Sequence, residues 1–159
     1  MRKLFVYKWK FIGISAAANI SNLSNDSKYK AGYQLGLPVY RKFSSRKWKF
    51  DTGLFFNSIG AKDARLNYVM VPTEVGRTLF LLSPCGNSMN FSAGVYGAYK
   101  VGGDKTFADF DAGLRAKLYA EMGSFKFWFG YQRGMIEVVS GSKAYNNVFT
   151  LGANMYLGR

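Results

Sequence analysis

Histidine is absent from this 159-residue chain, and cysteine occurs once, at Cys85. Without histidine, the Ser–His and Cys–His nucleophilic sites and the histidine ligands of catalytic zinc centres are excluded. A single cysteine cannot form an intrachain disulfide or a multi-cysteine zinc site. We therefore predict that the protein is not an enzyme and that it binds no metal and no cofactor.

Long apolar runs and proline are also scarce. No run of about eighteen apolar residues is present, which excludes a transmembrane helix. Proline occurs three times, whereas the chain has 18 Gly, 14 Phe and 11 Tyr. This composition favours strands and turns. A membrane is not excluded, because a spanning strand needs only about 9–11 residues and gives a much weaker signal than a helix.

Acidic residues are few: nine Asp and Glu oppose 22 Lys and Arg, which gives a net charge of +13. Such an excess favours an anionic partner, either nucleic acid, phospholipid or lipopolysaccharide. The alternative is that the charges only keep loops and strand ends soluble, since net charge informs association rather than fold. The only features that favour nucleic-acid binding are the basic charge and the scattered aromatic residues. We therefore do not expect the protein to bind nucleic acid.

Eight segments alternate in polarity with a period of two, as strands do, and turn-rich stretches separate them. They run over about 9–21, 30–42, 47–58, 65–81, 88–101, 107–120, 124–134 and 147–158. No linker divides them, so we predict one domain over 1–159, with strands from about 9 to 158. Pro38 and Pro72 fall inside two segments and predict a bulge or bend at each.

The polar face of these segments has the composition of a barrel interior. Seven strand glycines lie on it: Gly13, Gly36, Gly53, Gly94, Gly113, Gly130 and Gly152. Glycine weakens a solvent-facing strand, but in a narrow lumen it makes room for large neighbours. We predict a polar lumen network of Asp51, Asp109, Asp111, Arg115 and Lys117. Asp109 and Asp111 share one face, about 7 Å apart, so a glycosidase-like pair is the alternative.

These patterns predict an all-β fold, an eight-stranded antiparallel up-and-down transmembrane β-barrel in the outer membrane, with a filled interior and no open pore. Its apolar face would contact outer-membrane lipid, including lipopolysaccharide. The role expected is structural or mediated by loops. The alternative is a soluble lipocalin-like barrel that binds an apolar ligand, in which the apolar face would point inward.

Four loops would project from the end opposite the termini, over about 22–29, 59–64, 102–106 and 135–146. Loops carry most partner contacts, and the last is the longest. We predict that a protein partner would bind there, through Glu137, Ser142, Lys143, Tyr145 and Asn146. The alternative is a loop without a ligand.

Five stretches resemble small outer-membrane β-barrels of Bacteroidetes, of PorT-like or OmpA-like type. They are 66–72 (LNYVMVP), 91–99 (FSAGVYGAY), 110–114 (FDAGL), 129–135 (FGYQRGM) and 150–156 (TLGANMY). The resemblance covers about residues 9 to 158 and implies an eight-stranded barrel in the outer membrane without an assigned activity. Two departures are the degenerate signal-like start and the end at Arg159, where similar proteins have an aromatic residue.

Overall fold

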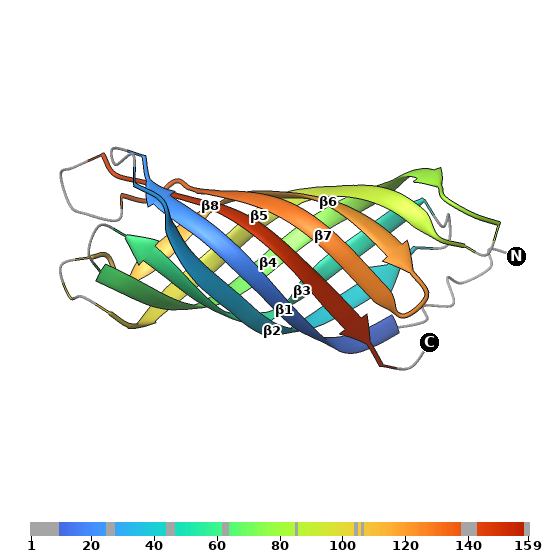
Figure 1. The fold of residues 1–159 in the computed structure, drawn as a ribbon, viewed down its shortest axis with the longest axis horizontal. Coiled ribbons are helices and arrows are strands. Elements are labelled where there is room, and N and C mark those ends of the chain that lie inside the picture. Colours follow the sequence, from blue (N-terminus) through green and yellow to red (C-terminus); the bar gives the residue numbers. More distant parts are fainter. Residues whose placement is uncertain are drawn as a thin grey trace, which may run out of the picture.

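A computed structural model describes residues 10–24, 28–43, 47–61, 64–84, 86–103, 105, 107–137 and 143–157. These residues form eight strands (Figure 1). The strands are β1 (Lys10–Leu23), β2 (Lys30–Lys42), β3 (Trp48–Ala61), β4 (Ala64–Leu81), β5 (Ser88–Gly102), β6 (Phe110–Met122), β7 (Phe125–Gly134) and β8 (Asn146–Tyr156). Cys85 and Ser142 lie outside the described residues. No helix in the described ranges is long and apolar enough to cross a membrane.

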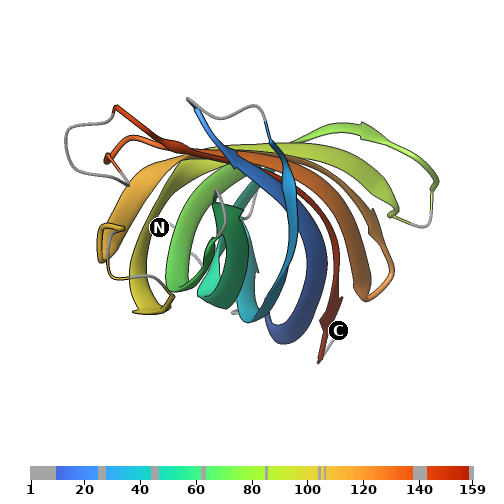
Figure 2. The same ribbon diagram turned by 60° about the vertical axis from the view of Figure 1, so that its left-hand side comes forward.

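Each strand pairs antiparallel with its sequence neighbours, and β8 pairs with β1 to close the barrel. The eight-stranded up-and-down fold is therefore confirmed. The first residue of β1 and the last of β8 lie at the same end of the barrel, which we call the termini end (Figure 1). The opposite end is the loop end. The strands are strongly inclined to the long axis of the barrel in both ribbon views (Figure 2).

Side chains alternate between the lumen and the outer surface along most of each strand. In β6, Asp111, Arg115 and Lys117 are buried, whereas Phe110 and Leu114 are exposed on the other face. The same alternation on the other strands covers the outside of the barrel with large apolar side chains, including Ile14, Leu35, Leu54, Val75, Val95, Phe127 and Leu151. We call this surface the apolar belt. Its outward orientation is the reverse of what the lipocalin-like alternative requires.

Interior glycines give space to rings from neighbouring strands, as the sequence predicted. A β-carbon on Gly36 would lie 2.3 Å from the Phe55 ring, and one on Gly152 would lie 2.8 Å from the Trp128 ring. These distances are shorter than any van der Waals contact between carbon atoms. The two aromatic residues can therefore fill the lumen only because their neighbours lack side chains.

The prolines do not shift the strand register. Pro38 pairs with Gly53, and Pro72 pairs with Tyr96, both in register. Around Pro72, the β3–β4 pairing is interrupted between Thr52 and Phe55 and resumes unchanged, because proline has no N–H to donate. The register shifts fall elsewhere, between Lys10 and Ile12, between Asn67 and Tyr68, and between Thr78 and Phe80. The predicted bulges at the prolines are therefore wrong, whereas the ladder is interrupted on one side of each proline, between β1 and β2 at Pro38 and between β3 and β4 at Pro72.

The lumen has two parts. Toward the loop end, apolar side chains pack against one another in what we call the loop-end cluster. Its members are Leu23, Phe55, Ile59, Leu66, Tyr68, Met70, Tyr96, Ala98, Phe107, Ala144 and Val148. The remainder of the lumen, toward the termini end, is occupied by charged and polar side chains.

Candidate functional site

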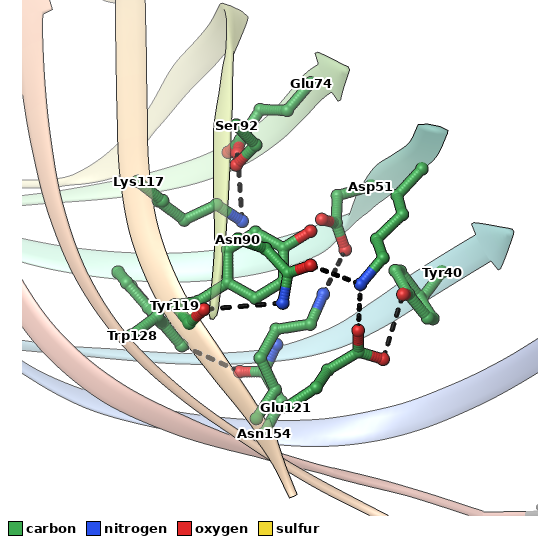
Figure 3. A network of polar contacts seen from close by, with 12 residues as sticks. Tyr40, Asp51, Glu74, Asn90, Ser92, Lys117, Tyr119, Glu121, Trp128 and Asn154 are labelled. Atoms are coloured by element: carbon green, nitrogen blue, oxygen red, sulfur yellow. Dashed lines mark hydrogen bonds and ion pairs between the residues drawn. The ribbon is translucent and has the colours of Figure 1, made fainter. Parts of the chain in front are cut away.

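The polar part of the lumen is centred on Glu121 of β6 (Figure 3). Lys49 of β3 donates to Glu121 and to the Oδ1 atom of Asn90. The Tyr40 hydroxyl donates to the Oε1 atom of Glu121 at 2.9 Å, and the Lys42 ammonium lies 3.1 Å from the same oxygen. Three strands, β2, β3 and β6, are thus joined at one carboxylate. A buried charge of this kind is tolerated because both of its oxygens are paired.

A second ion pair joins β7 to β3 across the lumen. The Lys126 ammonium donates to the Oδ1 atom of Asp51 at 2.7 Å. It also lies over the rings of Tyr40 and Tyr119, 3.9 Å and 4.4 Å from their centroids. The attraction between a cation and an aromatic ring adds to the ion pair and holds this buried lysine between the two rings.

Glu74 of β4 accepts contacts from three side chains, of which Figure 3 labels Ser92 and Lys117. The Ser92 hydroxyl donates at 2.8 Å, the Lys117 ammonium lies at 3.0 Å, and the Nε atom of Arg115 lies at 3.4 Å. The Arg115 guanidinium also lies 5.1 Å from the centroid of the Trp128 ring. The whole set, with Lys49, Asp51, Glu121 and Lys126, is the lumen network.

The buried charges of the described residues cancel. Four are basic, Lys49, Arg115, Lys117 and Lys126, and four are acidic, Asp51, Glu74, Asp111 and Glu121. Each acid contacts a base or a hydrogen-bond donor on another strand. These contacts cross-link the strands, although one oxygen atom each of Asp51, Glu74 and Asp111 accepts no hydrogen bond within the described residues. No group of three or more His, Cys, Asp or Glu in the described ranges could hold a metal ion.

The predicted lumen residues divide into two groups. Asp51, Asp111, Arg115 and Lys117 are buried in the lumen. Asp109 is not: it precedes β6, its side chain is 72% exposed, and its carboxylate lies 2.9 Å from the ammonium of Lys100, whose side chain is nearly buried. The expected place for Asp109 is therefore wrong, because the strand begins one residue later. The glycosidase-like alternative fails with it, because the two carboxylates do not face one site.

Asp111 belongs to the boundary between the network and the loop-end cluster. Its Oδ2 atom accepts from the Tyr96 hydroxyl and from the Asn146 amide, each at 3.0 Å. Asn146 is therefore a buried lumen residue rather than a residue of the partner-binding loop, which corrects that prediction. Of the other predicted loop residues, Lys143 is exposed, whereas Glu137 and Tyr145 are half-buried.

Sequence reasoning missed the acids that organise the network, Glu74 and Glu121, and the base Lys126. A signal for Glu74 existed, since Glu74 and Arg77 have opposite parity in one strand. The structure has the two side chains on opposite faces of β4. Glu74 points inward, whereas Arg77 points outward, with its guanidinium 5.7 Å from the centroid of the Trp48 ring.

Comparison with family models and with curated proteins gives no match. Solved structures match in fold. The crystal structure of Neisserial surface protein A (NspA) superposes with a TM-score of 0.61 at 12% identity, over 92% of this chain and 97% of NspA. Ail, the attachment invasion locus protein of Yersinia pestis, superposes with a TM-score of 0.59 at 13% identity, over 94% of this chain and 100% of Ail. At such identities the likeness shows one common fold, a small closed barrel of antiparallel strands.

Proposed function

We propose that this protein is a small outer-membrane β-barrel with a structural or loop-mediated interaction role and no catalytic activity. The observation that carries the proposal is the apolar belt, which surrounds a charged and hydrogen-bonded lumen. In water such a surface would associate, whereas in a bilayer it matches the lipid chains. The strands, of 10 to 18 residues, are long enough to span.

The proposed role at the surface is contact with anionic partners at the loop end. The eight buried charges cancel, so the net charge of +13 is carried by the rest of the chain. Ail has been crystallised in complex with the heparin analogue sucrose octasulfate, and its fold matches this one with a TM-score of 0.55. Lys143 is the exposed cation of the predicted partner loop, which also includes Glu137, Ser142 and Tyr145.

The finer assignment, to PorT-like or OmpA-like barrels of Bacteroidetes, rests on the five sequence stretches alone. Outer-membrane lipid, including lipopolysaccharide, is the partner proposed for the apolar belt. Exposed aromatic side chains near both ends of the belt support this: Trp48 lies at the start of β3 near the termini end, and Tyr99 lies on β5 near the loop end.

The test is refolding from urea into detergent micelles, followed by electrophoresis of boiled and unboiled samples. A closed membrane barrel should stay folded in SDS without heating, migrate differently after boiling, and show a strand-rich circular dichroism spectrum. Folding in detergent-free buffer to a soluble monomer, with no heat-dependent shift, would contradict the proposal.

A further inference from the structure

Arg133 projects from the outer surface of the barrel. It lies on β7 between Gln132 and Gly134, both of which are buried, so the alternation of the strand directs its side chain outward, where it is exposed. It pairs through the backbone with Leu114 of β6 and Asn147 of β8. Within the part of the chain that the structure describes, the Arg133 guanidinium makes no hydrogen bond or ion pair.

This arginine lies inside the apolar belt rather than beyond it. β6 begins at Phe110, four residues before Leu114, so an exposed aromatic ring lies farther toward the loop end than the residue that pairs with Arg133. Tyr99 of β5 pairs with Phe110 and is also exposed. Toward the termini end, β7 continues with the exposed Phe129. A cation among apolar side chains near the end of a strand is well placed to pair with the anionic group of a lipid.

A groove on the outer surface adjoins Arg133. It has a volume of about 550 Å³ and runs across β5, β6 and β7. Its side-chain lining is Ala93, Val95, Leu114, Ala116, Tyr131 and Arg133. Ala93 and Ala116, the smallest side chains of this lining, are paired across β5 and β6, and Arg133 is its one charged side chain that faces outward. The groove therefore offers an apolar channel and one positive charge to the same ligand.

Asn147 of β8 is the backbone partner of Arg133 in the β7–β8 ladder, so its side chain is directed to the same outer surface. The Tyr131 hydroxyl donates to the Oδ1 atom of Asn147 at 3.1 Å. Because Oδ1 accepts this hydrogen bond, the Nδ2 atom of the same amide is the donor that Asn147 offers to a ligand. Arginine binds phosphate through two parallel N–H bonds, and an adjacent amide supplies a third to the same group.

We propose that this surface binds one anionic glycerophospholipid, with its phosphate on Arg133 and Asn147 and an acyl chain in the groove. The proposal rests on the membrane location proposed above. Among outward-facing residues of the described strands, the charged ones are Arg41, Arg65, Arg77 and Arg133. Of these four arginines, Arg133 lies on β7, whereas the other three lie on β2 and β4. One cation complements one phosphodiester, whereas lipid A, with two phosphates, requires a second cation nearby.

The experiment is native mass spectrometry of the refolded barrel in detergent, titrated with phosphatidylglycerol or with phosphatidylcholine of the same acyl chains. The wild type should retain one phosphatidylglycerol with about tenfold preference over phosphatidylcholine. Arg133→Gln should remove that preference. Ala116→Leu, which fills the groove and keeps the charge, should also weaken retention of phosphatidylglycerol. Arg65→Gln, which removes an outward arginine away from the groove, should bind as the wild type does.

Equal retention of the two lipids by the wild type, an unchanged preference in Arg133→Gln, or tighter binding of lipid A than of phosphatidylglycerol would each overturn the lipid site. Only protein that shows the heat-dependent gel shift is analysed, which confirms that each variant is folded. Failure to obtain any such protein would contradict the membrane barrel itself. A folded barrel without lipid preference would contradict the lipid site alone.

Discussion

Gly152 and Gly97 lie on opposite surfaces of the barrel wall and predict opposite effects of the same substitution. Gly152→Ala should reduce the free energy of unfolding by about 1–3 kcal/mol, because the new methyl group would overlap the Trp128 ring. Gly97→Ala should be neutral or should stabilise by up to about 1 kcal/mol, because its nearest neighbour would be Phe110 at 3.7 Å. Urea titration in detergent measures both, and equal effects would contradict the packing described for the lumen.

Removing the charge of Glu121 alone should lower the free energy of unfolding substantially. Glu121→Gln leaves Lys49 buried beside a neutral amide, so we expect a cost of about 3–5 kcal/mol. The control is Asp109→Asn: the Asp109 side chain is 72% exposed and its partner Lys100 also donates to the Phe107 carbonyl, so about 0–1 kcal/mol is expected.

The double variant Glu121→Gln/Lys49→Met should cost less than the sum of the two single changes, because it removes both charges of the pair. Additive costs in the urea titration would show that the two residues do not stabilise each other.

The residues of the network were only partly predictable. Asp51, Arg115 and Lys117 share a face with several strand glycines, so their direction followed from alternation. Which partner each charge would meet did not follow, because partners such as Glu74 and Lys126 come from strands distant in the sequence. The register of the whole closed sheet determines which charges meet. The alternation of polarity along a single strand contains no information on that register.

At the scale of the strands, alternation located all eight but misdescribed the loop end. The predicted barrel had its apolar side chains on the outer surface. In the loop-end cluster they point inward as well, so β3 and β4 are apolar on both faces there and their period of two is obscured. Phe55, which breaks the pattern of β3 in the sequence, is one of these inward residues.

Met70 and Val71 are adjacent on β4 and test this assignment of faces. Met70 is fully buried in the loop-end cluster, whereas Val71 is about half exposed on the apolar belt. Met70→Ala should lower the free energy of unfolding by about 2–5 kcal/mol because it leaves a cavity. Val71→Ala should change it by less than about 1 kcal/mol, because detergent takes the place of the lost methyl groups. A larger cost for Val71→Ala in the urea titration would reverse the inside and outside of β4.

For the whole molecule, the division of charge is as informative as the division of apolar surface. The buried residues of the described lumen include four acids and four bases, so the charges of this buried set cancel. The excess of Lys and Arg therefore lies outside this buried set. Composition alone showed the excess but not its place, since the place depends on which side of each strand closes on the lumen.

This division predicts how the folded barrel behaves on an immobilised sulfated polysaccharide. Retention should weaken steeply with salt, because the screening length falls from about 10 Å at 0.1 M to about 3 Å at 1 M. Lys143→Glu and Lys105→Glu, at exposed sites of the loop end, should elute at lower salt than the wild type. Lys47→Glu, at the termini end, changes the net charge equally and should have a smaller effect if the loop end binds the polyanion. Equal shifts for all three variants would show that net charge alone governs binding, and the loop end would then lose its proposed role.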